Sequence, residues 1–170
     1  CRIFKKSKKQ SECEIHMRKQ LKFEKAKELN NILFELYGFE SYITKKDKIE
    51  IVEEEGTKTL VLNDFPSFFF HEEKLVPMLK LLYKKNFLKK ITIDMGAIKF
   101  VCNGADVMRP GITNIEDGIK ANDFITIIDE THGKFLSVGI ALLSTDGMRS
   151  QTGGKVIKNL HFIGDKLWSM

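Results

Sequence analysis

Cysteine is scarce in this sequence, and long apolar runs are missing. The chain of 170 residues holds three cysteines, an odd number, with no Cys-x-x-Cys pair. This argues against a disulfide framework and a zinc knuckle, and it favours a reducing compartment such as the cytosol. No apolar run approaches the roughly 20 residues that a membrane helix needs, and no signal-peptide pattern opens the chain. We therefore expect a cytoplasmic protein without a membrane segment.

Motifs for nucleotide and metal chemistry are also missing. The run Gly153-Gly154-Lys155 is followed by Val156, where a phosphate-binding P-loop needs Ser or Thr, and Arg149 stands where that loop's first glycine belongs. The dinucleotide pattern Gly-x-Gly-x-x-Gly is absent. The histidines are widely scattered and form no His-Glu-x-x-His pair. These absences argue against nucleotide hydrolysis and dinucleotide binding, and they predict no cofactor and no metal site.

Charge is distributed unevenly between the two halves of the chain. Residues 1–90 hold 20 Lys and Arg against 14 Asp and Glu, whereas residues 91–170 hold 8 against 9. A basic first half favours an anionic partner, of which nucleic acid is the commonest. The alternative is a lysine-rich solvated surface without a specific ligand.

Residues 1–90 are predicted to form a small α+β domain. Apolar spacing from about residue 14 to residue 37 is typical of one helical face, and Gly38 offers a stop. KIEIVEE and TLVLN alternate as the strands of a hairpin, and SFFFHE follows as a buried strand. A second helix is expected over about residues 73–86, with Pro77 in its first turn.

Residues 91–170 are predicted to form a small closed barrel. Lysine density falls near residue 90 and glycine density rises. A short strand at 91–93 and a short helix are followed mostly by strands, with DFITIID and FLSVGIALL paired across THGK and LHFIGDKLW closing the chain. The segment LSTDGMRSQTGGK is predicted to be a polar, mobile loop.

The segment DMGAIKFVCNGADVMRPG carries a binding hypothesis. Asp94 can cap a helix that begins at the next residue. Gly96 and Ala97 would leave backbone N–H groups open to a phosphate or a ribose, because their side chains are minimal. Lys99 and Arg109 would flank that surface. The alternative is that the glycines serve only the tight turns of a small barrel.

This segment resembles the signature of the PUA domain, the RNA-binding module of pseudouridine synthases and archaeosine transglycosylases, over almost twenty residues. With FKK near the start, KKDKIEIV, VPMLKLLYK and the closing LHFIGDKLW, the chain resembles the malignant T-cell-amplified sequence family over almost its whole length. The resemblance implies an α+β fold. It places a small α+β domain at residues 1–90 and a PUA pseudo-barrel, mostly β with short helices, at residues 91–170.

The resemblance also implies a non-enzymatic translation factor. Such a protein binds the small ribosomal subunit and tRNA and supports post-termination recycling, re-initiation and non-standard initiation. It forms a heterodimer with a zinc-containing partner, the density-regulated protein. The residues carried over to the RNA-facing surface are Met95, Gly96, Ala97, Lys99 and Arg109, and charge alone adds Lys89 and Lys90 as phosphate contacts.

Two alternatives stay open. One is a PUA-containing RNA-modification protein or a generic tRNA-binding or RNA-binding module. The first 90 residues are few for a catalytic domain, and they show no convincing nucleophile or metal set. The other alternative is a fragment of a larger ligatin-type initiation factor, which shares this two-domain start.

Overall fold

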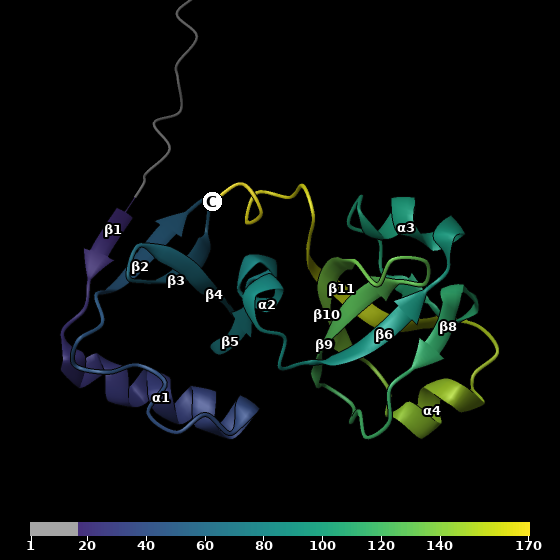
Figure 1. The fold of residues 1–170 in the computed structure, drawn as a ribbon, viewed down its shortest axis with the longest axis horizontal. Helices are drawn as coiled ribbons and strands as arrows, with labels where there is room; N and C mark the ends of the chain where they lie inside the picture. Colours follow the sequence, from purple (N-terminus) through teal and green to yellow (C-terminus); the bar gives the residue numbers. More distant parts are fainter. Residues whose placement is uncertain (1–16) are drawn as a thin grey trace, which may run out of the picture.

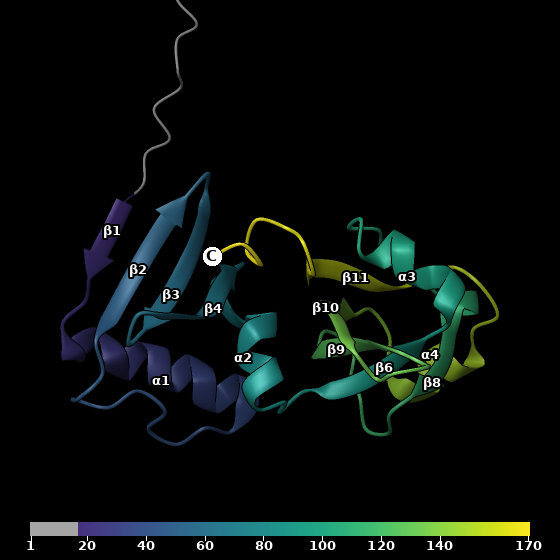
Figure 2. The same cartoon turned by 45° about the horizontal axis from the view of Figure 1, so that its top comes forward.

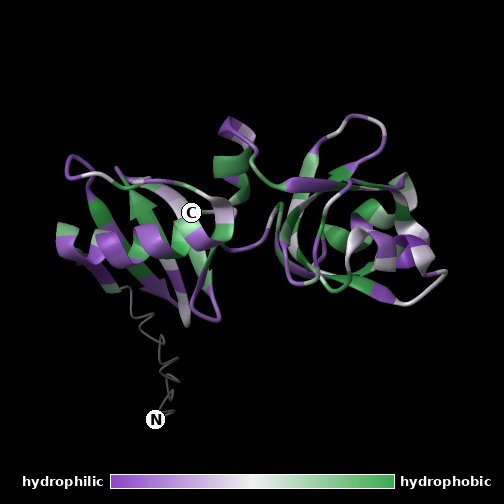
Figure 3. Ribbon diagram, turned by 90° about the horizontal axis from the view of Figure 1, so that it is seen from below, coloured by the Kyte–Doolittle hydropathy of each residue, from purple (hydrophilic) through white to green (hydrophobic). Residues whose placement is uncertain are grey.

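The computed structural model describes residues 17–170. The predictions for residues 1–16, including the basic start of the chain, lie outside the described residues. Two sheets lie side by side along the long axis of the molecule, and helices pack against both (Figure 1). Hydrophobic residues concentrate on the strands, while the connecting loops are mostly hydrophilic (Figure 3). The predicted α+β class is confirmed.

The first sheet is a five-stranded antiparallel meander in the order β1-β2-β3-β4-β5. Helix α1 runs across one face of this sheet (Figure 2). Its Leu33 is buried there with Leu60 and Phe68, because the apolar side of the helix meets the apolar side of the strands. The elements are β1 (Met17–Gln20), α1 (Phe23–Tyr37), β2 (Ile49–Glu54), β3 (Thr57–Leu62), β4 (Phe65–His71), β5 (Lys74–Pro77) and α2 (Leu79–Lys84).

Two predicted helix starts in this half are wrong. The first helix begins at Phe23, because residues 17–20 pair with β2 as a strand. The second helix begins at Leu79, because residues 74–77 pair with β4. Pro77 therefore closes a strand instead of opening a helix. In both places sheet pairing outweighed the helical pattern, with a strand distant in the chain for residues 17–20 and with the adjacent strand of a tight hairpin for residues 74–77.

The second sheet curls into a six-stranded pseudo-barrel in the order β7-β11-β10-β9-β6-β8. Strands β6 and β9 pair in parallel, and the other neighbours pair antiparallel. The predicted hairpin across THGK is confirmed as β9–β10. The elements are β6 (Lys89–Ile93), α3 (Met95–Val101), β7 (Val107–Met108), a 3-10 turn (Arg109–Gly111), β8 (Ile112–Ile115), β9 (Phe124–Asp129), β10 (Phe135–Ala141), α4 (Thr145–Ser150) and β11 (Lys155–Phe162).

The predicted loop LSTDGMRSQTGGK is wrong in its first half, where α4 forms. Ser144 caps this helix, since its Oγ accepts a hydrogen bond from the Gly147 N–H at 3.1 Å. Met148 is fully buried against the barrel core. Met148, together with the buried Thr145, holds a short helix against the barrel that the polar and glycine-rich composition does not reveal.

A shared hydrophobic cluster joins the two sheets. Phe69 of β4 and Leu82 of α2 pack with Phe124 and Val138 of the barrel. The segment after β11 returns toward the first sheet (Figure 1). Its Trp168 packs against the same cluster. The junction between the two halves is therefore a packed apolar contact rather than a bare linker.

Candidate nucleic-acid interface

Helix α3 is fixed at its first turn by two carboxylates. The Asp94 Oδ1 atom accepts a hydrogen bond from the Ala97 N–H at 2.8 Å, which confirms the predicted cap. The Met95 N–H donates to Glu130 Oε1 at 3.2 Å. The expectation that Ala97 offers a free N–H is therefore wrong, because the cap occupies that donor. A ligand here meets side chains and the surface of Gly96 instead of a row of free amides.

The two sides of α3 differ sharply. Ile98 and Val101 pack on the barrel core, as their spacing predicts. The Lys99 Nζ atom lies 5.2 Å from the centre of the Phe100 ring. A cation beside an exposed aromatic ring can contact a phosphate and a base together. The exposed side consists of Met95, 51% exposed, Gly96, Lys99 and Phe100, 57% exposed.

The glycines of this segment have different roles. A Cβ atom at Gly96 would meet only Asp94 Oδ1, at an ordinary 3.4 Å, so this position has room on its outer side. A Cβ atom at Gly111 would approach the Ala97 Cβ to 3.1 Å, so Gly111 serves close packing. Gly104 lies in the turn that follows α3 and has a φ of +88°, a conformation that other residues rarely adopt. The tight-turn alternative thus explains Gly104, close packing explains Gly111, and neither explains Gly96.

Arg109 holds the barrel together through hydrogen bonds to two backbone carbonyls. Its Nε atom donates to the Met148 carbonyl at 2.6 Å, and its Nη1 atom donates to the Ile112 carbonyl at 3.3 Å. The side chain is half-buried. It therefore positions α4 and is less free than Lys99 to follow a ligand.

Lys89 and Lys90 lie at the opposite end of β6 from α3. The Lys89 Nζ atom is 4.0 Å from Glu116 Oε1, and the Lys90 N–H donates to Glu116 Oε2 at 2.8 Å. The strand separates its two ends by about 13 Å at about 3.3 Å per residue. The structure brings Met95, Gly96 and Lys99 together on α3, while the two lysines occupy a separate place.

Two exposed apolar side chains escaped the sequence prediction. Phe100 is 57% exposed, and Met108 of β7 is 50% exposed. Phe100 follows Gly96 by four positions, so helical spacing places both on the same side of α3. That spacing is the signal that could have identified Phe100. Met108 had no comparable signal, because β7 is only two residues long.

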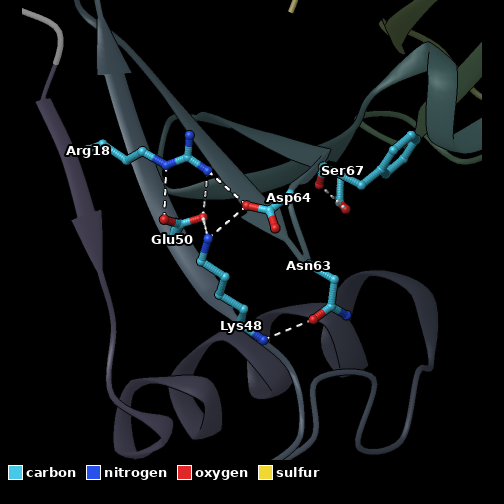
Figure 4. Close-up of polar contacts among 7 residues, drawn as sticks. Arg18, Lys48, Glu50, Asn63, Asp64 and Ser67 are labelled. Carbon is cyan, nitrogen blue, oxygen red and sulfur yellow. Dashed lines mark hydrogen bonds and ion pairs between the residues drawn. The ribbon is translucent and has the colours of Figure 1, made fainter.

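A cluster of charged residues on the first sheet has a structural role (Figure 4). Arg18 donates to both carboxylate oxygens of Glu50, at 2.9 and 2.7 Å. Lys48 Nζ lies 3.3 Å from Glu50 and 2.8 Å from Asp64. Hydrogen bonds from Arg18 and then Lys48 lower the pKa of the Glu50 carboxyl. These cations are matched by carboxylates, so they tie β1 to β2 instead of facing a ligand.

Cys102 and possible metal ligands were the groups to consider for covalent chemistry among residues 17–170. Burial raises the pKa of the Cys102 thiol, which disfavours the reactive thiolate. Among residues 17–170, no three His, Cys, Asp or Glu side chains gather where they could hold a metal ion. Within the same residues, no helix has the length and apolar character needed to cross a membrane.

Comparison with protein families divides the chain into two matched segments. Residues 89–163 match the PUA domain, and residues 17–85 match a domain of unknown function, DUF1947. The crystal structure of a hypothetical protein from Pyrococcus horikoshii is 31% identical and superposes with a TM-score of 0.76. That similarity covers 90% of this chain and 98% of the other. The small first domain followed by a PUA pseudo-barrel is thus confirmed.

Similar proteins match over nearly the whole chain. An uncharacterized protein of Methanocaldococcus jannaschii is 40% identical over 85% of this chain and 89% of its own. Translation machinery-associated protein 20 of Saccharomyces cerevisiae is 29% identical over 92% and 93%. Malignant T-cell-amplified sequence 1-A of Xenopus laevis is 35% identical over 89% and 90%. The chain therefore belongs to the malignant T-cell-amplified sequence family.

Proposed function

We propose that this protein is a non-enzymatic translation factor that acts by binding RNA. The observation that carries the proposal is the exposed side of α3, where Lys99 and Phe100 flank the open Gly96 on a PUA domain. Similarity along nine-tenths of the chain to a translation machinery-associated protein supports the cellular process. The raised pKa of Cys102 gives no support to a nucleophilic enzyme.

The proposed site of action is the small ribosomal subunit, with tRNA as a second RNA ligand. There the protein supports post-termination recycling, re-initiation and non-standard initiation in the cytoplasm. Its proposed partner is a zinc-containing protein similar to the density-regulated protein. We assign partner binding to the first domain, since the exposed side of α3 is assigned to RNA.

Electrostatics dominates the expected interaction. The chain carries a net charge of +5 with its basic excess in residues 1–90, and on α3 itself Lys99 supplies the positive charge. Lysine side chains that neutralise phosphates release condensed counterions, so binding weakens as salt rises. If several phosphates are contacted, affinity falls by orders of magnitude between roughly 50 and 200 mM salt.

Co-sedimentation tests the proposal. The tagged full-length protein is followed through ribosomal gradients from its own cells at low and moderate salt, and proteins in the same fractions are identified. We expect it to travel with free small subunits beside a zinc-ribbon partner. A protein that stays at the top of the gradient at both salts contradicts the proposal. Modification of tRNA by the purified chain would favour the RNA-modification alternative.

The α3 surface is tested with Gly96→Val in the same gradients. A Cβ atom at Gly96 would meet only Asp94 Oδ1, at 3.4 Å, so we expect the variant to keep its fold while a branched group blocks the close approach of RNA. Asn31→Val introduces the same side chain at an exposed position of α1 and serves as the control. Loss of small-subunit binding in the first variant alone supports the assignment. Equal binding by both folded variants removes Gly96 from the site.

A further inference from the structure

Aromatic rings from three distant segments meet at the junction of the two domains. The Tyr83 ring of α2 has its centroid 5.3 Å from that of Phe135 at the start of β10. Its centroid is also 6.0 Å from that of Trp168, in the segment after β11. These rings form a continuous stripe that crosses from the first domain to the PUA domain.

The central ring of this stripe is both exposed and held in place. Tyr83 is 46% exposed, yet its hydroxyl donates to the Phe135 carbonyl at 2.8 Å. Leu79 and Leu82 are buried in the hydrophobic cluster at the junction and hold α2 in place. Burial, and then the Asp129 carboxylate, raise the pKa of Tyr83, so the phenol stays neutral at pH 7. A fixed, neutral aromatic face is a suitable platform for a nucleic-acid base.

Lysine ammonium groups stand at both ends of the stripe. The Lys80 Nζ atom lies 5.6 Å from the centre of the Trp168 ring and donates to the Met170 carbonyl at 3.0 Å. The Lys90 Nζ atom lies 5.9 Å from the centre of the Phe135 ring. Within residues 17–170, neither lysine forms an ion pair with a carboxylate. Their charges remain available to phosphates, unlike those of Arg18 and Lys48.

We propose that this stripe is a second RNA-binding site, separate from α3, which takes a single-stranded segment. A base stacks on Tyr83, and the adjoining phosphates contact the ammonium groups of Lys80 and Lys90. The inference rests on the proposed function in taking RNA as the ligand. The site, called the junction surface below, consists of Lys80, Tyr83, Lys90, Phe135 and Trp168.

The position of the junction surface gives it a mechanical consequence. Lys80 and Tyr83 belong to the first domain, whereas Lys90 and Phe135 belong to the PUA domain. One RNA segment bound there contacts both domains and opposes any change in their relative orientation. The exposed side of α3 would then be presented to a second RNA at a fixed angle.

Trp168 provides a direct measurement, because it is the single tryptophan of the chain. The purified full-length protein is titrated with an end-labelled oligouridylate of about 10 nucleotides, within the site sizes of single-strand binders. Anisotropy of the label reports binding, while indole emission reports the junction surface. We expect emission to be quenched in step with the anisotropy. Binding without a change in emission overturns the proposal, and so does an absence of binding at low salt.

Charge variants test the phosphate contacts. Lys90→Gln is compared with Lys46→Gln, which removes the same charge from an exposed lysine of the first domain. Log affinity falls with log salt, and loss of one phosphate contact makes this fall less steep, reducing the size of the slope by about 0.7 for single strands. We expect that decrease in the Lys90 variant alone. Equal slopes in both variants overturn the assignment of Lys90.

Ring variants test stacking at Tyr83. We expect Tyr83→Leu to lose about tenfold or more in affinity, the usual effect of removing one base–aromatic stack, and Tyr83→Phe to keep most of it. Equal affinities of the two variants overturn the stacking role.

Polyglutamate of matched length is the second probe. If it quenches the Trp168 emission as much as RNA does, base recognition is overturned in favour of an acidic protein ligand.

These outcomes are independent of the ribosome experiment. A protein that binds the oligouridylate at Trp168 but ignores small subunits retains the junction surface and loses the proposed function. A protein that binds small subunits through α3 but leaves Trp168 emission unchanged retains the function and loses this inference.

Discussion

Adding one methyl group at Gly139 tests how tightly the barrel is closed. Gly139 lies in β10, between β9 and β11, at a shift in the β10–β11 register. A Cβ atom there would stand 2.7 Å from the Lys158 carbonyl oxygen and 2.7 Å from the Ile157 Cγ2 atom. Favourable contacts between carbon atoms lie at about 3.5–4.0 Å, so β11 must retreat by roughly 1 Å. Gly139→Ala therefore strains β11, the strand that pairs with β7 and leads into the C-terminal segment beside the first domain.

The magnitude follows from what must move. Overpacking a well-filled core costs about 1–3 kcal/mol, and the upper part applies because one contacting atom is backbone. We predict a loss of about 2–3 kcal/mol in the free energy of unfolding. At about 2–4 °C per kcal/mol for a chain of this size, the melting temperature falls by about 5–10 °C.

Gly153 supplies the matched control. No heavy atom lies within 4 Å of a Cβ built there, and its backbone is not left-handed. Gly153→Ala should leave stability unchanged or raise it by about 0.4–1 kcal/mol, because the unfolded chain loses freedom. Urea denaturation is monitored by far-UV circular dichroism. The denaturation midpoints of the variants are compared, and they report stability when the m-values are equal. If Gly139→Ala matches the wild-type or the Gly153→Ala midpoint, the reasoning about β10 and β11 is refuted.

Further variants probe the α3 surface and the charged cluster. Asp94→Ala removes the helix cap and should lower the free energy of unfolding by about 1 kcal/mol in urea titrations, whereas an unchanged midpoint would deny the cap a role. Glu50→Gln should destabilise the protein at pH 7. Since the pKa of Glu50 is lowered, its contribution is complete above about pH 4.5 and disappears as pH falls through the lowered value. Urea midpoints of the Gln variant and wild type should converge on acidification, and a constant gap would contradict this. Lys99→Glu should weaken small-subunit binding in gradients, while Lys46→Glu should not, and equal losses would point to net charge alone.

Local sequence determined α3 and much of its binding surface. Asp94 is a preferred cap residue, and the three-residue spacing of Ile98 and Val101 defines an inward side without help from the rest of the fold. Gly96 and Lys99 are consequently placed outward. The hairpin across THGK was likewise predictable, because its alternating strands and turn are adjacent in the chain.

Tertiary structure decided the elements whose partners are distant in the chain. Residues 17–20 became a strand because β2, distant in the chain, offered hydrogen bonds, and the segment around Met148 became α4 because Met148 packs into the barrel core. Whether the Ala97 amide was free depended on the geometry of the cap, which composition does not give. The meeting of Tyr83, Phe135 and Trp168 depended on the packed junction between two domains. Periodicity records which side of one element is buried, but only the folded chain determines which distant side chains share a surface.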